Sequence, residues 1–407
     1  MNITPPATAE TSNPDQSNVA HKVKAQVLLT PLLTTLISAA AGMSIANVYY
    51  NQPILGLLMK SFSASTQQVA LVPFLTQMGY ASGVLLISPL GDRLERKSLI
   101  LVTMLMLAIA LALTAVMPTY SWMAFASLII GLSATVTQQL VPMAVMLAQP
   151  ERRGKVIGTV TGGILLGVLL ARTVSGFVSQ QWGWQTMFGL ASCVMVATAA
   201  VLFFLLPKMQ PTTQVSYPKL MLSIVVLFKS HSVLRWSALI QALVFSSFMA
   251  FWCNLTLLLE QSPAHLGSAA IGMFGIIGAV GVLAAPIAGR LADRHGSKIM
   301  VRIGVVLTLI AFSVLWLGQG SIASLVAGIV ILDLGVQASQ VSNQSRVYAL
   351  DPAARSRLNT VFMTAMFLGG ALGTAMSTYL YTQFGWNGVC GFAMAVLSLA
   401  LAAACRK

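Results

Sequence analysis

The chain has 407 residues, of which 57% are hydrophobic and only 8% are charged. Soluble domains carry roughly a quarter charged residues, and the mean hydropathy here is +0.83, so a soluble globular fold is excluded. A net charge of +14 would suggest nucleic-acid binding in a soluble protein. The basic residues cluster at one end of the hydrophobic segments, however, so we expect no nucleic-acid partner.

Residues 1–25 are polar and rich in Thr, Ser, Pro and Asn, which is typical of a disordered tail. They lack the charged region and short apolar core of a removable signal peptide. A helix needs about 20 apolar residues to cross a bilayer. We predict twelve transmembrane helices, at residues 27–50, 69–90, 99–117, 122–147, 156–178, 187–206, 234–259, 269–292, 299–317, 322–349, 358–381 and 389–404.

The fold class is therefore an all-α membrane protein with two bundles of six helices. The longest polar connection, residues 208–232, separates an N-terminal bundle (26–207) from a C-terminal bundle (233–407). Of the 23 basic residues, all but Lys60 and Arg172 lie in the tail, in this linker, or at one end of the predicted helices. Lys and Arg are enriched on the cytoplasmic side of membranes, so we expect both termini to be cytoplasmic.

The cysteines and histidines predict neither disulfides nor a metal site. The four cysteines lie singly in apolar segments and the four histidines in polar segments, without ligand spacing. The phosphate-binding pattern G-x-x-x-x-G-K-[ST] is also missing, so ATP is not the expected energy source. We expect no cofactor and no enzymatic activity, since no nucleophile and base stand together in the predicted helices.

An internal repeat relates the two predicted bundles. The loop after the second helix contains Asp92-Arg93, and the loop after the eighth contains Asp293-Arg294, 201 residues later. The pairs Gly183-Trp184 and Gly385-Trp386 lie 202 residues apart. Two related halves of six helices are implied.

With these features the chain resembles the major facilitator superfamily, whose signature G-x-L-A-D-R-x-G-R-K lies between the second and third helices. Residues 289–298 match that signature almost completely, and residues 88–97 match it more weakly, with Ser88 and Glu95 at two glycine positions. The resemblance implies a pseudo-twofold pair of bundles that works as a monomeric transporter by alternating access. The drug and sugar efflux branch is the most similar.

The resemblance also implies a gate on the cytoplasmic side, where an Asp at a helix end pairs with Arg near a neighbouring helix terminus. The pairs carried over are Asp92 with Arg93 and Asp293 with Arg294. The full set of expected gate residues is Asp92, Arg93, Arg96, Lys97, Gly289, Asp293, Arg294, Gly296 and Lys298. The alternative is that these charges only anchor the chain's orientation.

Asp333 and Arg172 stand out because they are charged residues inside predicted membrane helices. A charge at the centre of a bilayer costs at least a few kcal/mol, so each must face a cavity or a partner. Asp333 is a candidate for a proton-coupling or substrate-binding carboxylate, since a carboxyl group taken out of water can load and release a proton. The alternative is a structural Asp held by hydrogen bonds. Arg172 is the second candidate, and the two could pair directly, or Arg172 could reach outward to the interface.

Polar side chains on the first, fourth, seventh and tenth helices, which line the central cavity in this superfamily, form the expected substrate cavity. They are Asn47, Tyr50, Gln138, Gln241, Trp252, Asn254, Gln337, Gln340 and Asn343. Each could instead hold helices together. Gln337 and Gln340 follow Asp333 at helical spacing, so these three share one face.

We therefore predict a secondary transporter of a small organic solute in the bacterial inner membrane, driven by protons and acting as an efflux antiporter. Its partners would be the solute, protons and the lipid bilayer. Two departures from the efflux branch weaken antiport: the fourth helix has no Arg, and Ala171-Arg172 stand where a Gly-Pro pair is expected. A proton-coupled importer or facilitator of a sugar or other metabolite is the alternative, and a membrane receptor or enzyme is the alternative from another class.

Overall fold

The computed structural model describes residues 29–116, 119–209, 211, 215–260, 267–278, 287, 289–292, 294–351 and 354–406. Across these segments the chain is helical with short connections, and no strand occurs in them. The predicted tail at 1–25 lies outside the described residues.

The first half of the chain contains α2 to α10. Their bounds are α2 Pro31–Ala46, η1 Gln52–Ile54, α3 Leu55–Phe62, α4 Thr66–Leu86, α5 Leu90–Arg93, α6 Arg96–Val116, α7 Tyr120–Ala134, α8 Thr137–Leu147, η2 Pro150–Arg152, α9 Arg153–Trp182 and α10 Trp184–Leu205.

The second half contains α11 to α17. Their bounds are α11 Tyr217–Ser230, α12 Ser232–Glu260, α13 Ser268–Ile277, α15 Ser297–Leu317, α16 Ile322–Tyr348 and α17 Arg355–Cys405.

Nine helical segments of the described chain are long and apolar enough to span a membrane, where α4 with α5 and α7 with α8 each count as one segment, and α2 and α13 are shorter apolar helices. Membrane helices satisfy all backbone hydrogen bonds within one segment, which is why long apolar stretches take this form. The structure also refines two predicted spans. Residues 122–147 form two helices, α7 and α8, that meet at Thr135 and Val136. Of the span predicted at 27–50, the described residues 29–50 are α-helical from Pro31 to Ala46.

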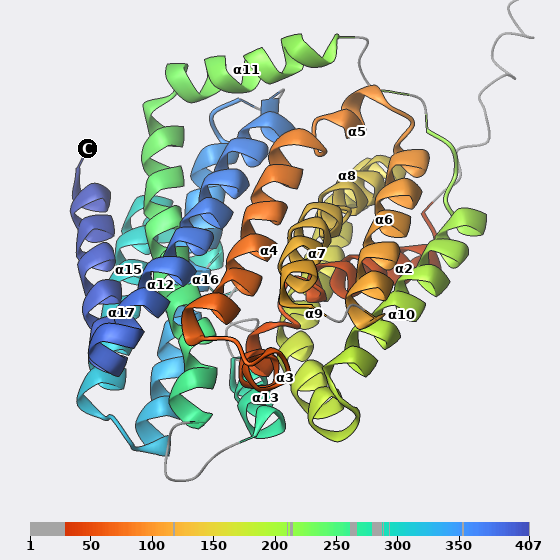
Figure 1. Ribbon diagram of the computed structural model, residues 1–407. Coiled ribbons are helices and arrows are strands. Elements are labelled where there is room, and N and C mark those ends of the chain that lie inside the picture. Colours follow the sequence, from red (N-terminus) through yellow and green to blue (C-terminus); the bar gives the residue numbers. More distant parts are fainter. Residues whose placement is uncertain are drawn as a thin grey trace, which may run out of the picture.

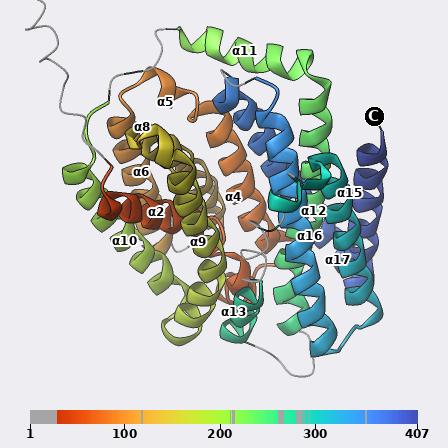
Figure 2. The same ribbon diagram turned by 180° about the vertical axis from the view of Figure 1, so that it is seen from behind.

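Two groups of helices stand side by side, α2 to α10 on one side and α12 to α17 on the other (Figures 1 and 2). Helix α11 crosses over one end of the molecule between them, so the linker predicted at 208–232 is helical in part. We call this end, where α5, α11 and the clustered basic residues lie, the basic end. Helices α3 and α13 lie toward the other end, the opposite end.

The repeated Gly-Trp pairs occupy equivalent turns in the two halves. Gly183 separates α9 from α10 with φ of 86°, and Gly385 breaks α17 into two helices with φ of 60°. These backbone angles favour glycine, since a Cβ atom would clash. Each following tryptophan is buried, Trp184 at 3% exposure and Trp386 at 6%.

The two halves meet along two pairs of helices, α4 with α17 and α9 with α13. At the second pair, a Cβ atom on Gly176 would lie 2.2 Å from the Ser268 carbonyl oxygen, so only a glycine allows this approach. Polar contacts join the halves toward the opposite end. Thr256 donates to the Gln52 carbonyl oxygen at 2.7 Å, and Lys60 pairs with Glu260 at 3.6 Å. The halves are therefore closed against each other at that end.

Candidate functional site

Arg172 lies in the middle of the molecule, with 2% of its surface exposed. Helix α9 supplies it, and Nε donates a hydrogen bond of 2.7 Å to Gln52 Oε1. Its guanidinium carbon lies 4.0 Å from the ring centroid of Trp252 and 5.0 Å from that of Tyr49. These aromatic faces shield the cation from water without neutralising its charge. One terminal nitrogen of the guanidinium has no hydrogen-bond partner.

Asp333 is buried on α16 with 6% of its surface exposed. Its side chain lies against Gly278 at the end of α13, where a Cβ atom would come within 2.6 Å of Asp333 Oδ2. That oxygen is buried and accepts no hydrogen bond. A buried carboxylate oxygen without a donor is unusual, because nearly all buried polar atoms are satisfied.

Arg172 and Asp333 are within electrostatic range of each other but form no direct ion pair. Among the described residues, Lys60 pairs with Glu260 and Arg96 pairs with Asp92. Helix α13 places the two charges: Gly275 packs on Arg172 Cβ, and Gly278 packs on the Asp333 carboxylate. The direct pairing that the sequence left open is thus absent, and two opposite buried charges lie within electrostatic range of each other without an ion pair.

Toward the basic end, α16 and α12 share a polar cluster. Ser339 Oγ donates to Gln241 Oε1 at 3.1 Å, and Asn343 Nδ2 reaches the same oxygen at 3.5 Å. Gln337 and Gln340, on the same side of α16 as Asp333, are half-buried and make no hydrogen bond within the described part of the chain. Their amides are therefore available to water or a solute.

A second polar network bridges the two halves near the basic end. Gln138 of α8 donates to Tyr80 of α4 at 3.0 Å and accepts from Asn359 of α17 at 3.4 Å. Asn359 accepts in turn from Tyr348 and Gln344 of α16, at 2.9 and 3.0 Å. Gln138 thus belongs to a contact between bundles as well as to a cavity wall.

The other expected cavity residues have varied surroundings. Asn47 is buried and donates to carbonyl groups of its own helix turn, Met43 and Ser44. Tyr50 is half-buried, and its carbonyl oxygen accepts a hydrogen bond from Ser175. Asn254 donates to Ser377 of α17 at 2.8 Å, so it joins two helices of the same half.

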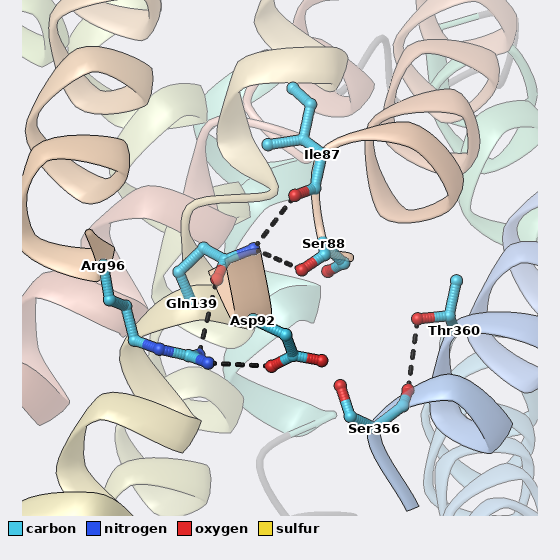
Figure 3. A network of polar contacts seen from close by, with 7 residues as sticks. All are labelled: Ile87, Ser88, Asp92, Arg96, Gln139, Ser356 and Thr360. Atoms are coloured by element: carbon cyan, nitrogen blue, oxygen red, sulfur yellow. Dashed lines mark hydrogen bonds and ion pairs between the residues drawn. The ribbon is translucent and has the colours of Figure 1, made fainter. Parts of the chain in front are cut away.

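The first copy of the gate motif forms a compact cluster (Figure 3). Asp92 pairs with Arg96 at 3.0 Å, whereas Arg93, the partner that was expected, is exposed. Arg96 also donates to Gln139 Oε1 at 3.4 Å, and the Gln139 amide donates to the carbonyl groups of Ile87 and Ser88. The cluster therefore ties the loop after α4 to α8. Figure 3 also shows Ser356 and Thr360 of α17, a helix in the second half of the chain.

Gly91 and Lys97 complete this cluster. A Cβ atom on Gly91 would lie 1.9 Å from Gln139 Oε1, so this glycine makes room for the amide. Lys97 is half-buried, with Nζ 5.2 Å from the ring centroid of Phe203.

The second copy is described only in part, and Asp293 lies outside the described residues. Gly296 has φ of 88° at the turn before α15, which explains the glycine at this place in the motif. Arg294 is exposed, Lys298 is half-buried and Gly289 lies on a helix beside Val341. The pair expected between Asp293 and Arg294 stays a prediction.

Several residues of the site were not predicted from the sequence. Gln52, which holds Arg172, and Gln77 both donate to Met249 at the centre, at 3.7 and 3.6 Å. Gln77 could have been found because it is polar inside a predicted membrane helix. The aromatic partners of Arg172 come from α12 and from the segment after α2, and no local pattern predicts that contact.

One described cavity lies away from all of these residues. It has a volume of about 650 Å³ at the basic end, between the start of α2 and the α8 to α9 connection. Its polar lining includes Thr34, Thr35, Arg152 and Lys155. It contains none of the expected site residues.

Comparison with known proteins identifies the family. The profile of the Major Facilitator Superfamily matches residues 35–284 and, in a second match, 261–406. The chain belongs to this superfamily. The "Uncharacterized transporter YgaY" of Escherichia coli O157:H7 is 39% identical over 373 residues, covering 91% of this chain and 95% of that protein. The "Probable transporter SCO4007" of Streptomyces coelicolor is 30% identical over 369 residues, covering 90% and 86%.

The fold also matches solved structures of this superfamily type. The crystal structure of the nucleoside transporter NupG (D323A mutant) aligns with a TM-score of 0.73 at 16% identity, covering 91% of this chain and 99% of that one. The predicted all-α superfamily fold is confirmed. The protein is a membrane transporter of this superfamily. The exact number of twelve helices and the cytoplasmic placement of both termini stay predictions.

Proposed function

We propose that this protein is a proton-coupled secondary transporter that exports a small organic solute across the bacterial inner membrane. The observation that carries the proposal is Asp333, a buried carboxylate with an oxygen that no donor reaches. Such a group changes its charge when a proton arrives, and a buried charge change alters which conformation is stable. No cofactor is needed for this cycle, because the proton gradient supplies the energy.

Arg172 connects this carboxylate to the contacts that close the opposite end. Its partner Gln52 also accepts, through its carbonyl oxygen, the hydrogen bond from Thr256 of the other half. Opening that end would separate η1 from α12, and it would move Gln52 and Trp252, which contact the Arg172 guanidinium, away from each other. The charge state of the centre and the closure of one end are thereby linked, as alternating access requires.

The Asp92, Arg96 and Gln139 cluster is the proposed gate element at the basic end. It connects α5 and α6 to α8 with charged and amide groups that can separate and re-form in water. Asp293, Arg294 and Lys298 would act in the same way in the second half. The basic residues around both loops favour placing this end in the cytoplasm.

Import or facilitated diffusion is the alternative within the same class, since the geometry serves either direction. Export is preferred on the resemblance to the efflux branch. Receptor or enzyme activity is the alternative from another class, and turnover chemistry without net flux would favour it.

The test is solute flux in proteoliposomes with an imposed proton gradient, after an accumulation screen in cells lacking or overproducing the protein. We expect wild-type flux to collapse with a protonophore, and Asp333→Asn to lose gradient-driven flux. Glu151→Gln, an exposed carboxylate at the basic end, is the control and should behave as wild type. Unchanged gradient-driven flux in Asp333→Asn would remove this residue from coupling. Flux insensitive to protonophores would indicate a facilitator.

A further inference from the structure

We propose that the transported solute is a small zwitterion, whose anionic group binds Arg172 and whose protonated amine binds Asp333. This inference rests on the proposed transport function and names the substrate class of the same site. Its basis is the pair of opposite charges that lie near each other, are both buried, and do not touch.

The anionic side of the proposed ligand is defined by Arg172. Apart from the Gln52 amide, the guanidinium has one long contact of 3.5 Å, to the Val168 carbonyl oxygen, and aromatic faces. A terminal nitrogen is left without an acceptor. Burying a cation without an anion is costly, and a carboxylate is the acceptor that matches a guanidinium edge best.

The cationic side is defined by Asp333. Its Oδ2 atom is buried and has no donor among the described residues, and Gly278 at the end of α13 lies beside it. A larger residue at 278 would fill this space. A protonated amine supplies both the charge and the N–H donors that the carboxylate lacks.

The two charged residues lie beside one short segment. Gly275 contacts Arg172 Cβ and Gly278 contacts Asp333 Oδ2, and the two glycines are three residues apart, or about 4.5 Å along a helix axis. While Asp333 is ionised, a solute with one charge leaves the other residue buried and unpaired, and a neutral solute leaves both. In that state a ligand with both charges satisfies both residues at once.

The ionisable groups that face this pair limit the alternatives. Besides Asp333, the groups within electrostatic range of Arg172 are Tyr49 and Cys253, and Arg172 is the charged group that acts on Asp333. A proton on Asp333 therefore removes the partner of the amine. Proton and solute compete for one carboxylate, which is the relation an antiporter needs.

The test is binding to the purified full-length wild-type protein, followed by its thermal unfolding. The probes are the twenty standard amino acids and a series of ω-amino acids, each with its amide, which keeps only the cation, and its N-acetyl form, which keeps only the anion. We expect some zwitterions to raise the unfolding midpoint and to bind at least about tenfold more tightly than both derivatives, as the loss of a charged hydrogen bond requires.

Two variants test the binding of the ligand's anionic and cationic groups separately. In Asp333→Asn we expect the N-acetyl form to bind as well as its parent zwitterion, and in Arg172→Gln we expect the amide to do so. The wild-type probe series decides the matter even if one variant fails to fold. If no zwitterion binds, or if derivatives bind as tightly as their parents, the proposal is wrong and the charges are bridged by water alone.

The outcomes also separate this inference from the proposed function. Proton-driven flux of solutes that carry one charge or none would overturn the zwitterion and leave proton-coupled transport standing. Tight zwitterion binding without proton-driven flux would keep the substrate class and overturn proton coupling.

Discussion

Glu95 occupies the position of a glycine in the motif, and its side chain forms hydrogen bonds that a glycine could not form. Its carboxylate accepts hydrogen bonds from the backbone N–H groups of Lys97 and Ser98 at the start of α6, and from that of Met209 in the linker, at 3.1, 3.0 and 3.2 Å. A carboxylate at the first turn of a helix satisfies N–H groups that lack helical partners. The same side chain thus fixes the linker to the first half.

The pH dependence of this contact follows from the charge of Glu95. Burial alone would raise its pKa, but the hydrogen bonds from Ser98, Met209 and Lys97 outweigh burial and lower the pKa. A lowered pKa means that the contact stabilises the fold above the ordinary Glu value of about 4.3 and is lost as pH falls through the lowered value.

We therefore expect the Met209 amide to be protected from hydrogen exchange at pH 7 and to lose this protection, relative to the intrinsic rate at the same pH, only in acid. In Glu95→Ala the exchange should already be fast at pH 7, while Glu151→Ala serves as the matched carboxylate control. Equal protection of Met209 in Glu95→Ala and wild type would show that the carboxylate does not hold the linker.

Among the helices, the crossing of α4 and α7 depends most directly on glycine. A Cβ atom on Gly79 would lie 2.0 Å from the Leu128 carbonyl oxygen, and one on Gly131 would lie 2.0 Å from that of Thr76. Backbone lies on both sides, so the contact has no flexible side chain that could move away. Small residues at such crossings let membrane helices pack closely.

Gly79→Ala should therefore cost about 1–3 kcal/mol through overpacking, and its unfolding midpoint in detergent should fall. Gly158→Ala is the control: no described atom lies within 4 Å of a Cβ atom there, and removing a helix glycine gains about 0.5–1 kcal/mol. Tryptophan fluorescence during heating measures both. A Gly79→Ala protein as stable as wild type would mean that the helices are less tightly packed than this structure has them.

Hydrophobic length was enough to predict most of the elements, because the bilayer requires long apolar helices whatever their neighbours are. It could not predict the break at Thr135 and Val136, because the average hydrophobicity of residues 122–147 is that of one membrane helix. Helix α11 has only two buried residues, Leu220 and Ile224, and was predicted as linker because its length and charge do not resemble a membrane span.

Across the whole molecule, the sequence predicted that Asp333 and Arg172 lie inside the protein but not how they meet, and it did not predict that Arg96 is buried. Asp333 and Arg172 were identified because charges inside membrane helices are costly. The Gln52 bond, the Trp252 ring and the glycine contacts of α13 come from distant segments, so only the packed structure reveals them. The motif likewise predicted a charged cluster after α4. In the packed structure Asp92 forms its ion pair with Arg96 and not with Arg93.

The two bundles are closed against each other at the opposite end, and Gln52 links this closure to Arg172. In this account, a proton and a solute compete for Asp333, the second buried charge. The most direct test of this account is proton release on binding, followed with a pH indicator in weakly buffered detergent solution. The account predicts that a stabilising zwitterion releases protons from the wild-type protein and from Glu151→Gln, and releases none from Asp333→Asn. Binding without proton release in the wild type, or equal release from Asp333→Asn, would contradict it.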